Sequence, residues 1–131
     1  MQYAYARINS VLKKARLANI EVCDSSLILA DMQGVDHESE LYLIKKVCEW
    51  PRLVELAAKH SEPHRVAFYL YELASEFHAF WSKGKDTPSL RFIHEDNEMQ
   101  SLSKLAVARS VAIVISNGLG ILGVQPMDEM R

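Results

Sequence analysis

The chain has 131 residues, of which 49% are hydrophobic and 24% are charged. These values are typical of one soluble globular domain with a sizeable core. The formal net charge of −2 argues against a stand-alone nucleic-acid binder, and against DNA as a partner, because such proteins usually carry a basic excess. The charge is still compatible with a few local contacts within a larger binding surface.

The absence of targeting signals and the low number of cysteines both indicate a cytoplasmic protein. No apolar run reaches the roughly 18 residues that a membrane span needs, and residues 2–7 lack the basic start and apolar block of a signal peptide. The two cysteines, Cys23 and Cys48, are expected to be free thiols, because disulfides are rare in that compartment. We therefore expect a cytoplasmic protein that does not contact a membrane.

The first predicted helix runs from Gln2 to Ala18. Its apolar residues recur every three or four positions and so lie on one helix face; they are Ala4, Ile8, Val11, Leu12 and Ala15. No capping residue or proline precedes it that could start a helix. This abrupt beginning predicts that the helix is cut from a longer chain.

In the middle of the chain, the sequence pattern predicts helices that are shorter than the first one. Residues 19–35 hold an apolar cluster at 27–29 and a break at Gly34. A helix is then expected from about Asp36, as the cap, to Val47. Its inward-facing residues are expected to be Leu41, Ile44 and Val47. Pro51 is suited to the first turn of the next, short helix.

Two long helices dominate the second half. The stronger amphipathic pattern runs from Pro63 to about Ser82, and residues 84–100 are expected to form a loop with a short helical turn near 90–93. Residues 101–116 are apolar nearly all round, which is typical of a buried central helix. Asn117 and Gly118 are expected to end that helix, since both tolerate the left-handed conformation. The sequence thus predicts one all-α domain over residues 1–131, an antiparallel helical bundle.

No catalytic or metal site is predicted. His60 and His64 are four residues apart, but Pro63 interrupts that spacing and no third ligand is near. The glycines of residues 118–123 do not match a phosphate-binding loop, which needs a preceding strand. Five carboxylates are expected to lie on solvated faces: Glu38, Glu40, Glu95, Asp96 and Glu98.

Aromatic residues beside cations leave two interpretations open. Tyr3 lies close to Arg7, and Trp81 lies close to Lys83 and Lys85. Such pairs can stack on unpaired bases while the cations meet phosphates. Alternatively, Tyr3 fills a groove and Trp81 closes one end of the core, because aromatic residues at helical spacing are usually packing residues.

Four ordered sequence blocks resemble a known family. They are Gln2-Tyr3-Ala4-Tyr5-Ala6-Arg7, the Glu62–Leu70 segment, Phe77-His78-Ala79-Phe80-Trp81 and the Asn117–Val124 segment. In this order and spacing the blocks resemble the C-terminal anticodon-binding domain, or DALR domain, of arginyl-tRNA synthetases. The resemblance covers essentially the whole chain, and the Pro126–Met130 segment resembles the end of that family's enzymes.

The resemblance implies a helical bundle attached behind a Rossmann-like class I catalytic domain, which would lie upstream of Gln2. The full enzyme joins L-arginine to its tRNA with ATP, and magnesium is implied with the ATP. The catalytic signatures of that domain are absent from this chain. No catalytic residue and no cofactor site are therefore predicted here; the implied partners are the anticodon loop of an arginine tRNA and the catalytic domain.

The resemblance also implies which residues meet the RNA. Tyr3 matches the tyrosine that helps to hold the anticodon loop, and Arg7 is suited to a phosphate or base contact. Trp81 stands where the family places an aromatic residue against the loop nucleotides. Met130 matches the terminal methionine that approaches the same loop.

Asn117 and Gly118 are implied to shape the turn that places this tail. The chain also departs from the family pattern in two places. Residues 112–115 are Ala-Ile-Val-Ile, where many relatives carry Arg-Gln-Val-Leu, so the polar contacts of that arginine and glutamine are missing. Trp81 replaces the usual tyrosine, which keeps a stacking face but loses the phenolic hydroxyl.

Two alternatives remain at this point. The acidic balance and the apolar last helix also fit a helical module that docks a protein partner. A free-standing relative could bind tRNA without an attached enzyme. The upstream reading frame separates these hypotheses, because class I signatures there would support the synthetase and a stop before Met1 would favour the alternatives. Binding to an arginine tRNA, compared with an anticodon-substituted control, tests the anticodon claim itself.

Overall fold

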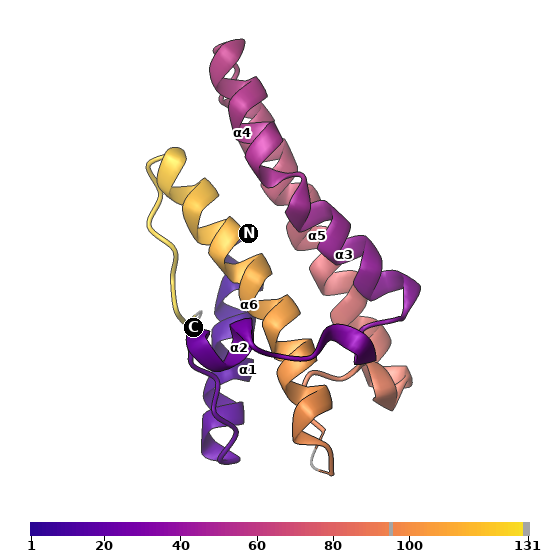
Figure 1. Ribbon diagram of the computed structural model, residues 1–131. Coiled ribbons are helices and arrows are strands. Elements are labelled where there is room, and N and C mark those ends of the chain that lie inside the picture. Colours follow the sequence, from indigo (N-terminus) through magenta and orange to yellow (C-terminus); the bar gives the residue numbers. More distant parts are fainter. Residues whose placement is uncertain (95, 130–131) are drawn as a thin grey trace.

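The computed structural model describes residues 1–94 and 96–129, and these form helices and turns without strands (Figure 1). The helices are α1 (Gln2–Leu17), α2 (Asp24–Ile28), α3 (Glu38–Cys48), α4 (Trp50–Lys59), α5 (His64–Asp86) and α6 (Glu98–Ile121). Two 3₁₀ turns, η1 (Met32–Gly34) and η2 (Pro88–Leu90), lie in the connections. The predicted all-α bundle is confirmed.

The helices α3 and α4 follow each other almost end to end alongside α5 (Figure 1). Two contacts fix the direction of this pair. Lys46 lies 2.6 Å from the carboxylate of Glu72, while Lys83, near the other end of α5, donates to the hydroxyl of Ser39 at 2.6 Å. The first half of α3 therefore faces the last half of α5, so the two helices are antiparallel.

Helix α6 is the central helix, as its sequence predicts. It packs against α1, α2, α3 and α5, and its apolar residues Leu105, Val111 and Ile115 are fully buried. By length and composition alone α6 could cross a membrane, with a mean hydropathy of 1.4 over its most apolar stretch, but 56% of that stretch is buried inside the protein. Within this fold α6 serves as the core helix.

The start of α3 differs from the prediction. His37, rather than Asp36, caps the helix: its Nδ1 accepts from the amide of Ser39 at 3.1 Å, and the side chain of Glu40 returns to the amide of His37. This is a reciprocal capping box. The inward face differs from the prediction at one position: Leu41 is exposed and Leu43 is buried instead. Ile44 and Val47 pack partly buried against the core, as predicted.

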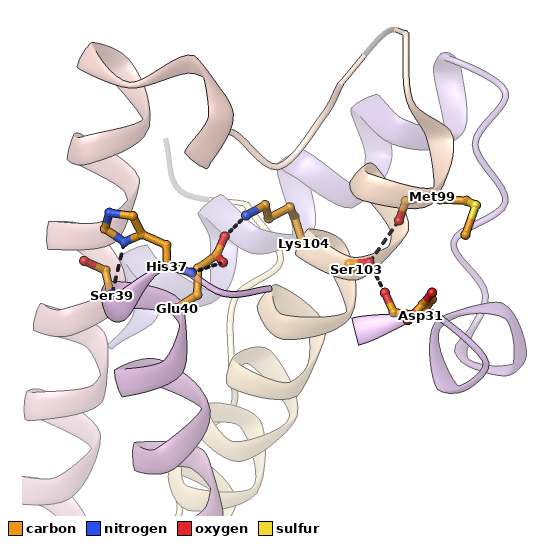
Figure 2. Close-up of polar contacts among 7 residues, drawn as sticks. All are labelled: Asp31, His37, Ser39, Glu40, Met99, Ser103 and Lys104. Atoms are coloured by element: carbon orange, nitrogen blue, oxygen red, sulfur yellow. Dashed lines mark hydrogen bonds and ion pairs between the residues drawn. The ribbon is translucent and has the colours of Figure 1, made fainter. Parts of the chain in front are cut away.

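A buried ion pair joins α3 to α6 and corrects the expectation that Glu40 is solvated. The carboxylate of Glu40 contacts the ammonium of Lys104, and the two side chains are only 1% and 3% exposed (Figure 2). Beside Lys104 in the chain, the hydroxyl of Ser103 contacts the carbonyl oxygens of Asp31 and Met99. Polar groups thus tie α3, α6 and the segment before η1 together inside the protein.

Helix α6 does not end at Asn117 and Gly118, which corrects the predicted turn. Both residues lie inside the helix. A Cβ at Gly118 would come within 2.6 Å of the buried Leu70 side chain, so this glycine allows α6 to approach α5 closely. Because its position is set by helix packing, the residue gives no stop signal.

The stop lies at Gly123, whose φ is +76°. The amide of Val124 donates to the carbonyl of Leu119 at 2.8 Å, and the amide of Gly123 donates to the carbonyl of Gly120 at 3.1 Å. This pair of hydrogen bonds is a Schellman motif, which commonly ends helices at a left-handed glycine. The tail of residues 124–129 begins there and returns beside α1 (Figure 1).

Candidate nucleic-acid interface

The predicted residues of α1 lie on its outer side. The apolar stripe of α1 is buried against the bundle, which leaves Tyr3 61% exposed. Arg7 lies one helical turn further along and is half-buried. The aromatic ring and the cation therefore stand on the same helix, next to the core.

Trp81 reaches the same region from the last third of α5. It is half-buried and packs against Phe92, with ring centroids 5.7 Å apart and planes inclined at 28°. The guanidinium of Arg7 lies over the Trp81 ring, 5.0 Å from its centroid. Trp81 thus packs against the core, as the packing interpretation predicts, and its ring also faces the guanidinium of Arg7.

Arg7 is held in place by a second contact on α5. Its Nη1 lies 3.1 Å from Nδ1 of His78. Because a guanidinium can only donate, Nδ1 must accept, so the imidazole is neutral and carries its proton on Nε2. Burial, followed by the charge of Arg7, lowers the pKa of His78 below its ordinary value.

One groove of about 920 Å³ is lined by all three of these residues, Tyr3, Arg7 and Trp81. Charged side chains form much of its remaining wall. The cations are Arg7, Lys13, Lys14, Arg16 and Arg109, and the carboxylates are Asp24, Asp128 and Glu129. The groove therefore carries a local basic excess on a chain whose net charge is −2.

Two of the three carboxylates are paired with cations of the same wall. Asp24 pairs with Arg109 at 3.1 Å, and Glu129 pairs with Lys13 at 3.4 Å. Lys14 and Arg16 are exposed and form no ion pair within residues 1–94 and 96–129. These two cations are consequently available to an anionic ligand.

The tail forms one wall of the groove, and Gln2 fixes it. The Gln2 amide donates from Nε2 to the carbonyl of Gln125 at 2.9 Å, and its Oε1 accepts from the amide of Met127 at 2.8 Å. Further along α1, Asn9 donates to Asp128 at 3.0 Å. Sequence reasoning missed the role of Gln2, although Gln2 stands first in the block that carries the family resemblance.

The other predicted site residues are not brought to this groove. Asn117 and Gly118 lie within α6 and do not line it. Met130 lies outside the described residues. Of the implied set, the structure therefore brings together Tyr3, Arg7 and Trp81.

The described residues contain no cluster of three or more His, Cys, Asp or Glu side chains that could hold a metal ion. Cys23 and Cys48 are free and exposed, as predicted. The groove presents two exposed or half-buried aromatic rings and a majority of cations among its charged side chains, a combination that suits stacking and phosphate binding.

The sequence model of the DALR anticodon binding domain family matches residues 1–130. The chain belongs to this family. The resemblance that the four sequence blocks indicated is thereby confirmed over nearly the entire length.

Curated relatives agree with this assignment of the DALR domain. The chain is 56% identical to an arginine–tRNA ligase of Ruegeria pomeroyi and 57% identical to one of Cereibacter sphaeroides, in each case over 131 residues. Each match covers the whole of this chain but only 22% of the relative. The DALR domain therefore corresponds to about a fifth of its relatives' length.

A solved chain named as an arginyl-tRNA synthetase of Campylobacter jejuni has the same fold. The TM-score is 0.79 over 98% of this DALR domain and 25% of that chain, at 22% sequence identity. At this identity the likeness supports the helical arrangement alone. It adds an independent confirmation of the all-α bundle.

Proposed function

We propose that this DALR domain binds the anticodon loop of an arginine tRNA as part of an arginine–tRNA ligase. The observation that carries the proposal is the groove in which Tyr3, Arg7 and Trp81 meet beside an excess of cations. Single-stranded RNA loops are recognised by stacking of splayed bases on aromatic side chains, with cations at the phosphates. The names of the relatives supply the arginine specificity of the proposal.

Tyr3 is proposed as the first stacking platform. Its ring is 61% exposed, and the helix that carries it is anchored in the core by buried residues on the opposite face. An exposed ring on a rigid helix loses little conformational entropy when a base stacks on it. Tyr3 would therefore receive a base without rearrangement of the bundle.

Arg7 and Trp81 are proposed to act together. In the free domain the guanidinium lies over the indole ring at 5.0 Å and is attached to His78. A phosphate in the groove would draw the guanidinium away from the ring, because a hydrogen bond between two charged groups is stronger than a cation–π contact at an exposed site. The face of Trp81 would then be free for a base.

The tail is proposed to close the groove from the α1 side. Asp128 and Glu129 line the groove, and Gln2 holds the preceding segment through two hydrogen bonds. The contact of Met130 with the loop remains a proposal that rests on the family resemblance. The tail would narrow the groove around single-stranded RNA and disfavour a duplex.

Catalysis is proposed to occur in another domain of the same enzyme, which would attach L-arginine to the tRNA with ATP and magnesium. The described residues do not fit these cofactors, because they contain neither a metal-ligand cluster nor a strand leading into a phosphate loop. The role of this domain would be to orient the tRNA. A cytoplasmic location follows from this role and is part of the proposal.

The proposal is tested by titrating the chain with an arginine tRNA and with an anticodon-substituted control, at several salt concentrations. We expect tighter binding to the cognate tRNA. Equal binding of both tRNAs would contradict the proposal and favour a tRNA-binding role without anticodon recognition. Absence of binding to either tRNA would favour the protein-docking alternative.

Substitution of Tyr3 sharpens this test. Tyr3→Ala should weaken cognate binding by about 1–3 kcal/mol, the usual contribution of one base–aromatic stack, without a change in thermal stability. Tyr71→Ala is the matched control, because Tyr71 is 67% exposed on α5 and does not line the groove. Equal affinity of the two variants would argue that Tyr3 does not contact RNA.

Trp81→Ala tests both interpretations of that residue. Because Trp81 packs on Phe92, we expect a loss of stability as well as weaker RNA binding. Trp81→Tyr, the residue usual in the family, should keep binding within a few-fold of the parent. Full binding by a folded Trp81→Ala variant would contradict the stacking role.

A further inference from the structure

A second hollow of about 420 Å³ shares two lining residues with the groove. Trp81 and Lys14 line both spaces. The second hollow lies where α1, the last turn of α5 and the loop after η2 meet, and its remaining lining includes Lys85, Arg91, Phe92 and Ile93. Its size lies within the range of small-ligand pockets.

The floor of this hollow is apolar and aromatic. Phe92 is buried and also packs against Phe77 and Phe80, with ring centroids 5.8 and 5.5 Å apart. Ile93 is half-buried beside it. A flat aromatic ligand entering the hollow would therefore meet a rigid apolar surface rather than mobile side chains.

The rim of the hollow is entirely basic among the described residues. Lys14, Lys85 and Arg91 are its charged side chains, and no described carboxylate lines it. Arg91 is held in position by its Nε, which donates to the carbonyl of Gly84 at 2.9 Å. The two lysines are exposed and form no ion pair with any described residue. An anion therefore has two uncommitted cations and a fixed guanidinium to approach.

An apolar aromatic floor with cations at its rim is complementary to a nucleotide, which has a flat base and an attached anionic phosphate. We propose that this hollow holds one further unpaired base of the RNA that occupies the first groove, with its phosphate at Lys85 and Lys14. The inference rests on the proposed function, because the same strand would occupy both spaces, which share Trp81 and Lys14. The domain would then hold at least two splayed bases.

Lys85→Glu is the principal test, and Lys59→Glu is its matched control. Lys59 ends α4, next to the start of α5, whereas Lys85 is near the end of α5; a helix of 23 residues separates these ends by about 34 Å. The probe is the anticodon stem-loop of an arginine tRNA. We expect Lys85→Glu to weaken binding several-fold and to lower the slope of log affinity against log salt by about one. Lys59→Glu should do neither.

A second measurement locates the base. Single loop nucleotides are made abasic in turn, and binding to the parent chain is compared with binding to Ile93→Ala. In the parent chain we expect at least two positions where loss of the base weakens binding about fivefold or more. At one of these positions the effect should shrink in Ile93→Ala, because that variant has already lost the floor contact.

The outcomes separate this inference from the proposed function. If Lys85→Glu binds like Lys59→Glu while Tyr3→Ala binds weakly, the second subsite is wrong and the proposed function stands. If no abasic position responds to Ile93→Ala, the base assignment is wrong. If the parent chain does not bind the stem-loop at all, the proposed function fails, and the second subsite fails with it.

Discussion

Two lysine–glutamate pairs in this domain have the same chemistry and opposite surroundings. The side chains of Glu40 and Lys104 are 1% and 3% exposed, whereas those of Lys13 and Glu129 are 70% and 69% exposed. The buried pair joins two core helices, and the exposed pair lies between α1 and the tail at the groove. The difference indicates that the buried charges depend on each other, because neither has water as an alternative partner, whereas the exposed charges can exchange each other for solvent or for an incoming ligand.

The largest expected effect comes from breaking the buried pair. Lys104→Met should destabilise the domain by about 3–5 kcal/mol, because it leaves the carboxylate of Glu40 buried without a countercharge. Glu40→Leu should have a similar effect through the uncompensated ammonium. Both losses are measured by chemical unfolding.

The double variant Glu40→Leu/Lys104→Met is the control for that prediction. Since it removes both charges and leaves apolar side chains of similar size, it should be close to the parent in stability, or more stable. Additive losses in the double variant would contradict the assignment of the pair as a single coupled unit. In that case the destabilisation would come from lost packing instead.

The next largest changes in stability are expected from substituting two glycines of α6 that are two residues apart. Gly118→Ala should destabilise the domain by about 1–3 kcal/mol, the usual result of adding a methyl group to a packed core, because its Cβ would approach Leu70 within 2.6 Å. A Cβ at Gly120 would meet no atom within 4 Å, so Gly120→Ala should stabilise the helix by up to about 1 kcal/mol. Thermal unfolding measures both.

The sign of these two changes is the informative result. If Gly118→Ala is as stable as the parent, the approach of α6 to α5 is looser than the structure has it. A loss of stability in Gly120→Ala would argue that the helix ends before Gly120, as the sequence alone predicts.

A smaller effect is expected at the exposed tail. Gln2→Ala removes both hydrogen bonds to the tail and should speed hydrogen exchange of the Met127 amide, with less than about 1.5 kcal/mol lost in global stability. Lys13→Ala removes only a solvated ion pair, so its effect should be near zero. Equal exchange rates in the two variants would contradict the role of Gln2 in fixing the tail.

Local sequence patterns predicted most of the fold. The stripes of α1 and α5, the proline at the start of α4 and the apolar character of α6 each depend on residues close together in the chain. The cap of α3 is a local error, because His37 takes the place of Asp36; two other errors concern long-range partners. Glu40 is charged, so a local pattern places it on the surface, whereas in the fold it is buried against Lys104. Gly118 has the local pattern of a helix stop, whereas in the fold it lies inside α6 against the side chain of Leu70.

Some residues of the candidate site could be predicted from the sequence and others could not. The family resemblance pointed to Tyr3, Arg7 and Trp81, and the structure brings them to one groove. Phe92 and Gln2 could not be assigned from the sequence. Phe92 belongs to a segment that is polar on average, and the tail that Gln2 holds lies at the opposite end of the chain.

The smallest expected effect is the loss of folding stability that accompanies protonation of His78, which lies between the core and the groove. The pKa of His78 is lowered below its ordinary 6.5 in the folded domain, first by burial and then by Arg7. As the pH falls below about 6.5 the unfolded chain therefore binds the proton first, and stability decreases until the pH reaches the folded pKa. Above 6.5 the group has no effect on stability.

Arg7→Met separates the two causes. Without the guanidinium the pKa of His78 should rise towards 6.5 but stay below it, since burial remains, and the loss of stability in acid should become smaller. The assigned ring resonances of His78, followed by NMR against pH, measure both values. A parent His78 that titrates at or above 6.5 would mean that Nδ1 does not accept from Arg7, because a protonated imidazole has no acceptor to offer. Arg7 would then rest on Trp81 alone and would be easier for a phosphate to displace.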